Sequence, residues 1–107
     1  MPAAEARVAI AMPGRYLTQL CKHFRHRRPV TLAEGQGRID FADGTCTLAA
    51  EEAVLVLRVT AAEAAAMPAL QDVVARHLLR FAFRDPPEIR WVPATEPEAA
   101  PSSPVAG

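Results

Sequence analysis

The sequence has no serine before Ser102 and contains none of the motifs GxSxG, GxGxxG or GxxxxGK[ST]. Without them, the nucleophile elbow of the α/β-hydrolases and the common glycine-rich phosphate-binding turns are excluded. Cys21 could act as a nucleophile beside a histidine only if its helix were distorted. The sequence therefore favours a non-enzymatic protein, and it predicts no catalytic residues and no cofactor.

Cysteine is also scarce, because Cys21 and Cys46 are the only two in 107 residues. Nothing in their positions calls for a disulfide, so we expect a reduced, cytoplasmic protein. Residues 1–14 lack the basic and long apolar segments of a secretory signal, and no apolar run is long enough to span a membrane. We therefore expect no membrane association.

The chain also has no excess of positive or negative charge. Twelve Lys and Arg balance twelve Asp and Glu, so the formal net charge at pH 7 is zero. A neutral chain is not typical of proteins that neutralise phosphates, and no nucleic-acid partner is expected. The charge is nevertheless uneven, because residues 15–28 hold five Lys and Arg and no acid.

The C-terminal residues differ in composition from the rest. Residues 93–107 contain four prolines and few large apolar side chains, a composition that cannot repay the entropy cost of ordering. We therefore predict a single α+β domain over residues 1–92 and a disordered, proline-rich tail over residues 93–107.

Hydrophobic periodicity predicts the first two elements. Apolar residues alternate over residues 6–10, which indicates a strand. An amphipathic helix is expected to begin at Pro13, since proline suits the first turn of a helix, and to end before Pro29.

The dipeptide Asp43-Gly44 predicts a β-hairpin in the strand-rich middle of the chain. If the loop consists of these two residues, Phe41 pairs with Cys46 and Cys46 lies in the core.

The remaining elements complete the order β-α-β-β-β-β-α-β. Residues 53–60 predict a strand, and Thr60 with Glu63 fits a capping box at the start of a second helix. Pro68 should kink or restart that helix, and residues 88–92 predict a short closing strand. Strands joined mainly by hairpins, with two helices, indicate an α+β fold in two layers, in which an antiparallel sheet carries both helices on one face.

The opposite face of this sheet is expected to be mixed in polarity. Such a face either is solvated or packs against a partner, and a homodimer through this face is one expectation. Its predicted residues are Thr31, Ala33, Arg38, Thr45, Thr47, Val54, Val56 and Arg58.

The segment QLCKHFRHRR, residues 19–28, resembles a metal-binding cluster at first sight. Successive helical residues are about 100° apart, however, so Cys21 and His23 lie on opposite flanks and cannot chelate one ion. His23 and His26 could share a face, but two ligands among basic residues make a weak cation site, and we predict no metal. The basic side chains suit an anion or an acidic partner, or they form a solvated helix face.

His77 lies on the apolar stripe of the second predicted helix, three residues after Val74 and four before Phe81. A histidine at such a position is more often a hydrogen-bonded core residue than a ligand or base. If it faced a pocket beside the first helix, it would be the best candidate in the chain for ligand binding or acid–base chemistry.

Four segments together resemble a small bacterial family of unknown function: RYLTQLCKHFRHR (15–27), GRIDF (37–41), LVLRV (55–59) and QDVVARHLLRFAFR (71–84). Members of this family also occur fused to siderophore-interacting flavoproteins. The resemblance implies a bacterial cytoplasmic protein with a link to iron or siderophore handling, and it carries over no catalytic residues.

Two hypotheses follow. The first is a non-enzymatic binding or accessory domain that contacts an anionic small ligand or a siderophore-interacting flavoprotein. The second is a metal- or redox-handling protein that uses Cys21, His23, His26 or His77. The predicted ligand- or partner-binding residues are Arg15, Gln19, Lys22, His23, His26, Arg27, His77 and Arg80.

Overall fold

The structure, a computed structural model, describes residues 2–94. The elements follow one another along the chain as β1 (Ala3–Ala9), α1 (Pro13–Phe24), β2 (Val30–Ala33), β3 (Gln36–Phe41), β4 (Gly44–Glu51), β5 (Val54–Ala61), a 3₁₀ turn η1 (Ala64–Ala66), α2 (Met67–Phe81) and β6 (Val92–Ala94). The predicted order of strands and α-helices is therefore confirmed.

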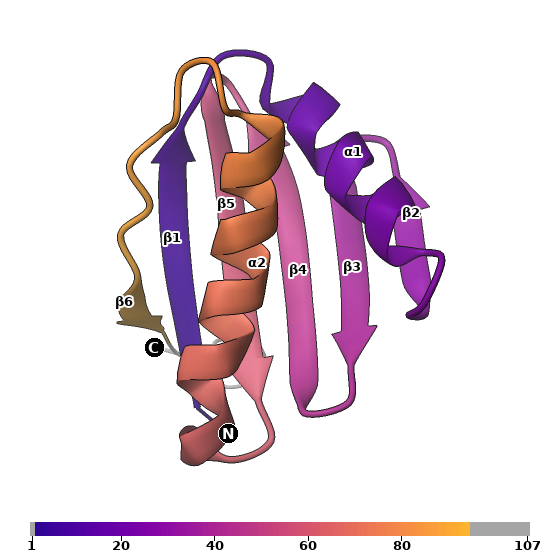
Figure 1. Ribbon diagram of the computed structural model, residues 1–107, viewed down its shortest axis with the longest axis vertical. Coiled ribbons are helices and arrows are strands. Elements are labelled where there is room, and N and C mark those ends of the chain that lie inside the picture. The colour runs from indigo at the N-terminus through magenta and orange to yellow at the C-terminus, as the bar shows by residue number, and fades with distance from the viewer. Residues whose placement is uncertain (1, 95–107) are drawn as a thin grey trace, which may run out of the picture.

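The strands form one antiparallel sheet in the order β2-β3-β4-β5-β1-β6. Both helices lie on the same face, with α2 in front of the centre of the sheet and α1 in front of the side that ends at β2 (Figure 1). This arrangement confirms the predicted α+β fold in two layers. No helix in the described part of the chain is both long enough and apolar enough to cross a membrane.

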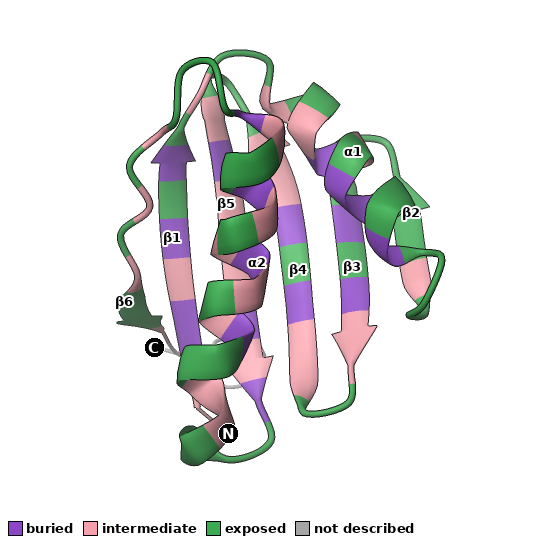
Figure 2. Ribbon diagram, viewed as in Figure 1, coloured by how far each residue is buried: buried purple, intermediate pink, exposed green. Residues whose placement is uncertain are grey.

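The core lies between the helices and the sheet. Each helix contributes an apolar stripe, with Leu17 and Leu20 on α1 and Val74 and Leu78 on α2. On the strands, buried residues alternate with more exposed ones, as the period of two requires (Figure 2). Among the described residues, no polar or charged side chain is buried in this core. Apolar burial against one sheet face is thus the main stabilising contribution.

The hairpin between β3 and β4 differs from the prediction by one residue. Phe41 pairs with Gly44 and Ile39 with Cys46, so the loop is Ala42-Asp43 rather than Asp43-Gly44. Gly44 begins β4 rather than forming part of the loop, and it does not adopt the left-handed conformation for which a turn would need glycine. A Cβ at Gly44 would overlap the carbonyl oxygen of Thr60 and lie 2.8 Å from a methyl carbon of Leu70, so this glycine permits close packing beneath α2.

Two predictions about the second helix have different outcomes. The capping box is wrong, because Thr60 belongs to β5 and no side-chain hydrogen bond caps η1 or α2. The predicted restart at Pro68 is confirmed, since η1 ends at Ala66 and Pro68 lies in the first turn of α2, where its missing N–H costs nothing.

The ends of two further elements also differ from the prediction. Helix α1 ends at Phe24, and residues 25–28 form a turn in which the N–H groups of Arg27 and Arg28 donate to the carbonyl of Phe24 at 3.0 and 2.8 Å. Strand β6 spans Val92–Ala94, so residues 88–91 of the predicted closing strand lie outside the sheet, and the sheet continues through Pro93 two residues past the predicted boundary at 92. An edge strand tolerates this proline. The rest of the predicted tail, residues 95–107, lies outside the described residues.

The packing at Gly44 generates a stability prediction. Gly44→Ala should lower the free energy of unfolding by about 2–3 kcal/mol, because the added methyl group overpacks the contact between β4, β5 and α2. Gly14→Ala is the matched control, since a Cβ there meets only the Cβ of Ala50, at 3.9 Å. In urea denaturation the control should be unchanged or more stable by up to about 1 kcal/mol. Equal stabilities for the two variants would contradict the assignment of Gly44.

Candidate functional site

The positive charges of the protein are balanced unevenly. Five arginines form ion pairs, namely Arg7, Arg38, Arg58, Arg76 and Arg90. Within residues 2–94 the other seven cationic side chains have no ion-pair partner, and all belong to α1, the C-terminal half of α2 or the turns that follow these helices. They are Arg15, Lys22, Arg25, Arg27, Arg28, Arg80 and Arg84.

The packing of α1 against α2 brings many of these side chains together. The helices run in opposite directions, and the N-terminal end of α1 lies near the C-terminal end of α2 (Figure 1). Aromatic contacts join them, because the ring of His23 lies 4.8 Å from that of His77 and 5.7 Å from that of Phe81, measured between centroids. The polar flanks of both helices therefore meet along this contact, and we call the line between α1 and α2 the groove.

His77 is held in a defined orientation at this contact. Its Nδ1 lies 2.7 Å from the carbonyl oxygen of Val73, one turn earlier in α2. A carbonyl oxygen only accepts, so Nδ1 carries a proton and, in the neutral ring, Nε2 keeps its lone pair. The ring also packs 4.8 Å from that of Phe24. His77 is thus half-buried and partly satisfied, as its position on the apolar stripe predicted, and Nε2 remains able to bind a ligand.

A pocket of about 540 Å³ opens beside this pair of histidines. We call it the histidine pocket, and all three histidines of the chain line it. Among the described residues, no acidic side chain lines it. Its lining residues are His23, Phe24, His26, Arg27, Arg28, Phe41, Val73 and His77.

A second pocket, of about 420 Å³, lies at the other end of the same helix contact, and we call it the arginine pocket. Phe83 is 67% exposed there, and the guanidinium of Arg84 lies 5.7 Å from the centre of its ring. In the part of the chain that the structure describes, this pocket also has no acidic lining residue. It is lined by Arg15, Tyr16, Gln19, Phe81, Phe83 and Arg84.

The electrostatics of the histidine pocket disfavour added positive charge. The pKa of His23 is lowered, first by partial burial and then by the nearby charges of His77, Arg80, His26 and Arg27. These groups belong to α2 and to the turn after α1, so the lowered pKa reflects the packing of the two helices. An anion in the pocket would offset the repulsion and favour protonation of His23.

The structure brings together most of the predicted site residues. His23, His26, Arg27 and His77 line the histidine pocket, while Arg15 and Gln19 line the arginine pocket. Arg80 lies near His23 without lining either pocket, and Lys22 is exposed and lines neither.

His77 meets the condition set for it, because it contacts His23 of α1 and lines the histidine pocket beside that helix. Two parts of the sequence prediction need correction. His26 and Arg27 lie in the turn after α1 and not on a helix face. Arg84 and Phe41 were missed as pocket residues. No helical spacing indicated Arg84, because it lies in the turn after α2, and the position of Phe41 depends on the fold.

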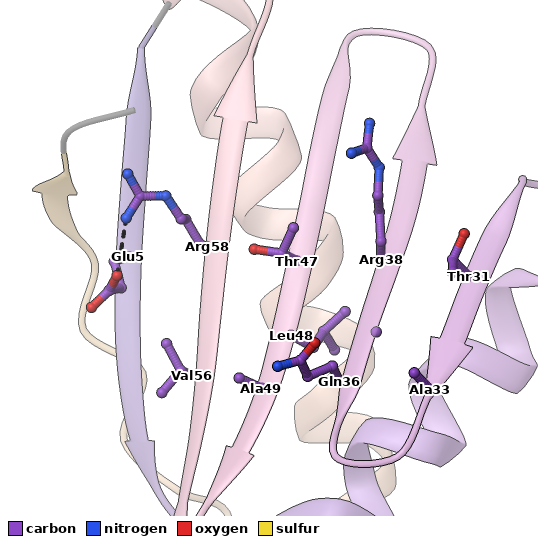
Figure 3. Close-up of a pocket in the computed structure, with 11 residues that line it drawn as sticks. Glu5, Thr31, Ala33, Gln36, Arg38, Thr47, Leu48, Ala49, Val56 and Arg58 are labelled. Carbon is purple, nitrogen blue, oxygen red and sulfur yellow. Dashed lines mark hydrogen bonds and ion pairs between the residues drawn. The ribbon is translucent and has the colours of Figure 1, made fainter. Parts of the chain in front are cut away.

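The open sheet face carries a third hollow, the sheet hollow, of about 380 Å³. Figure 3 shows Arg38 and Arg58 on opposite sides of Thr47 and Ala49, with Arg58 directed toward Glu5. The arginines of this face are paired, since Arg58 lies 3.2 Å from Glu5 and Arg38 lies 2.9 Å from Asp40.

The lining of the sheet hollow agrees with the predicted open face. Of the eight residues predicted for that face, all but Thr45 and Val54 line the hollow, together with Glu5, Gln36, Gly37, Leu48 and Ala49. Because the arginines of this face are already paired with acids, the face attracts an anion less strongly than the groove between the helices does. A homodimer through it stays a prediction.

The two cysteines are buried free thiols. Cys46 is fully buried, which raises its pKa to about 12, and burial likewise raises the pKa of Cys21. Cys21 packs against Gly37, where a Cβ would lie 2.5 Å from its sulfur. Thiols in such surroundings are protonated and inert at neutral pH. Across residues 2–94, no group of three or more His, Cys, Asp or Glu side chains is arranged to hold a metal ion.

This burial predicts the reactivity of the thiols. In native protein at pH 7.5, neither Cys21 nor Cys46 should react with Ellman's reagent on the time scale of minutes, because both are buried and protonated. Both should react at once in denaturant, and the absorbance of the released thionitrobenzoate measures this. Rapid labelling of one thiol in native protein would instead support the redox hypothesis.

Comparison with known proteins agrees with this fold. The NMR structure of PA4090 from Pseudomonas aeruginosa is similar, with 33% sequence identity and a TM-score of 0.75, and the match covers 90% of this chain and 100% of that one. No curated protein matches the chain. A family model described as "Uncharacterized protein conserved in bacteria (DUF2218)" matches residues 5–92. The chain therefore belongs to this family of uncharacterised bacterial proteins, as the resemblance of its four segments indicated.

Proposed function

We propose that the protein is a non-enzymatic binding domain whose histidine pocket holds an anionic group. One observation carries this proposal: three histidines and two arginines without ion-pair partners converge on one hollow that has no acidic lining residue in the described chain. A cluster of cationic donors without counter-charges is favourable for a carboxylate or a phosphate.

The donors of the pocket have distinct roles. Arg27 and Arg28 each offer a guanidinium fork that matches the geometry of a carboxylate or phosphate. His77 keeps Nδ1 engaged with Val73, so Nε2 is the atom that faces a ligand. His23 gains a proton when the anion enters, because the negative charge offsets the positive charges around it.

The floor of the pocket indicates what the anionic group is attached to. Phe24 and Phe41 pack edge to face, with ring centroids 5.3 Å apart, and both line the pocket. Aromatic surface beside cationic donors favours a ligand with an apolar or aromatic body next to its anionic group.

The resemblance to domains fused to siderophore-interacting flavoproteins supports a biological setting for this binding. On that basis the pocket serves bacterial iron or siderophore handling, with either an anionic small ligand or a flavoprotein as its partner. Two free cysteines support the cytoplasm as the compartment.

Sulfate is a suitable probe, because its charge does not change between pH 5.5 and 7.5. Arg27→Ala/Arg28→Ala should weaken sulfate binding about tenfold or more, since each change removes a charge-assisted donor. Arg76→Ala/Arg90→Ala is the matched control, because it removes the same charge from arginines outside the pocket that pair with Asp72 and Glu88. Isothermal titration calorimetry measures both variants.

The same titration has an expected pH dependence. Affinity should rise as the pH falls from 7.5 to 5.5, because binding is coupled to protonation of His23, and His23→Gln should reduce this rise. Equal losses in the two double variants, or affinity that falls with falling pH, would overturn the proposed function.

A further inference from the structure

The two pockets lie one after the other along the groove between the helices, and they share no lining residue. Gln19 and Phe81 line the arginine pocket. His23, one turn later in α1, and His77, one turn earlier in α2, line the histidine pocket, because the two helices run in opposite directions. Residues that face one another across the groove therefore follow a regular antiparallel register.

An aromatic contact divides the groove into its two pockets. The ring of His23 meets that of Phe81 edge to face, at 5.7 Å between centroids. His23 lines one pocket and Phe81 the other. A ligand that passed from one pocket to the other would cross this contact, and its middle would therefore meet the edges of two aromatic rings.

Both ends of the groove are cationic. Arg15 and Arg84 line the arginine pocket, and neither has an ion-pair partner among residues 2–94. Arg15 and His23 are eight residues apart on α1, a rise of about 12 Å along its axis. Arg27 and Arg28 lie beyond His23, so the cationic donors of the two pockets lie about 12 Å or more apart, with the contact between His23 and Phe81 between them.

We propose that the groove binds a single elongated molecule that carries an anionic group at each end and an apolar segment between them. This inference rests on the proposed function, because one end occupies the histidine pocket. The other end is held by Arg15 and Arg84, with Gln19 as an additional hydrogen-bond donor. Binding of the second end is intramolecular once the first is bound, so the two ends reinforce each other.

Decanedioate and decanoate test this proposal with wild-type protein. They share a ten-carbon chain and differ in the second carboxylate, and extended decanedioate matches the spacing of the two ends. Calorimetry at pH 6 should give decanedioate an affinity about tenfold or more above that of decanoate. Butanedioate, which is too short to reach both ends, should lack this advantage.

The variant Arg15→Ala/Arg84→Ala tests whether the second carboxylate binds in the arginine pocket. This variant should bind decanedioate and decanoate with about equal affinity, because only the histidine pocket then holds a carboxylate. Arg76→Ala/Arg90→Ala should leave the advantage of decanedioate intact, which controls for the loss of two positive charges.

The outcomes separate the two proposals. If decanoate binds through Arg27 and Arg28 but decanedioate binds no tighter, the proposed function stands and the two-ended ligand is overturned. An advantage that persists in Arg15→Ala/Arg84→Ala would also overturn it. If neither acid binds at millimolar concentration, both proposals are overturned.

Discussion

Both helices bury their apolar stripes against the same face of one six-stranded sheet, and this constraint determines where everything else can lie. A sheet that is covered on one face must place both helices side by side on it, because no other surface removes their leucines and valines from water. The stripe of each helix then faces the strands, and the residues at the flanks of the stripes meet at the line between the helices. His23, His77 and Phe81 are such flank residues. Core packing therefore accounts for the position of the groove, but it does not account for the chemistry of the residues that line it.

That chemistry follows from a separation of charges. The sheet face uses its acids to neutralise its arginines, as in the pairs of Arg7 with Glu51 and Arg58 with Glu5. The groove between the helices does the opposite and gathers cations with no acidic lining residue among residues 2–94. Like charges brought together raise the energy of the folded state, most strongly at low ionic strength. A protein that needed only stability would gain from a single acid among these cations, for example in the turn at residues 25–28.

The local elements of this fold were predictable from the sequence because their signals are local. Pro13 indicated where α1 begins, and the restart of the second helix at Pro68 follows from the missing N–H of proline. The errors occurred where contacts between segments that are distant in the sequence determine the local structure. Asp43-Gly44 has the composition of a hairpin loop, but Gly44 is required by the backbone of Thr60 and by Leu70, which come from segments that no short window contains. For the candidate site, the sequence indicated residues on each helix but not that the two sets of residues would meet. Helical geometry correctly separated Cys21 from His23, yet nothing in either helix indicated that His77 would contact His23.

Apart from Phe41 of β3, the residues that line the groove come from two segments separated by about half of the chain, residues 15–28 and 73–84. An unfolded chain holds these segments too far apart to present a site, so any molecule that binds in the groove binds the folded state alone. Ligand concentration then adds directly to the folding equilibrium, by about 2.7 kcal/mol at a hundredfold excess over the dissociation constant. For a domain of this size that increment is a substantial fraction of the total stability. In a cell, the abundance of such a protein would follow the supply of its ligand, because the unliganded chain spends more time in the open forms that proteases degrade.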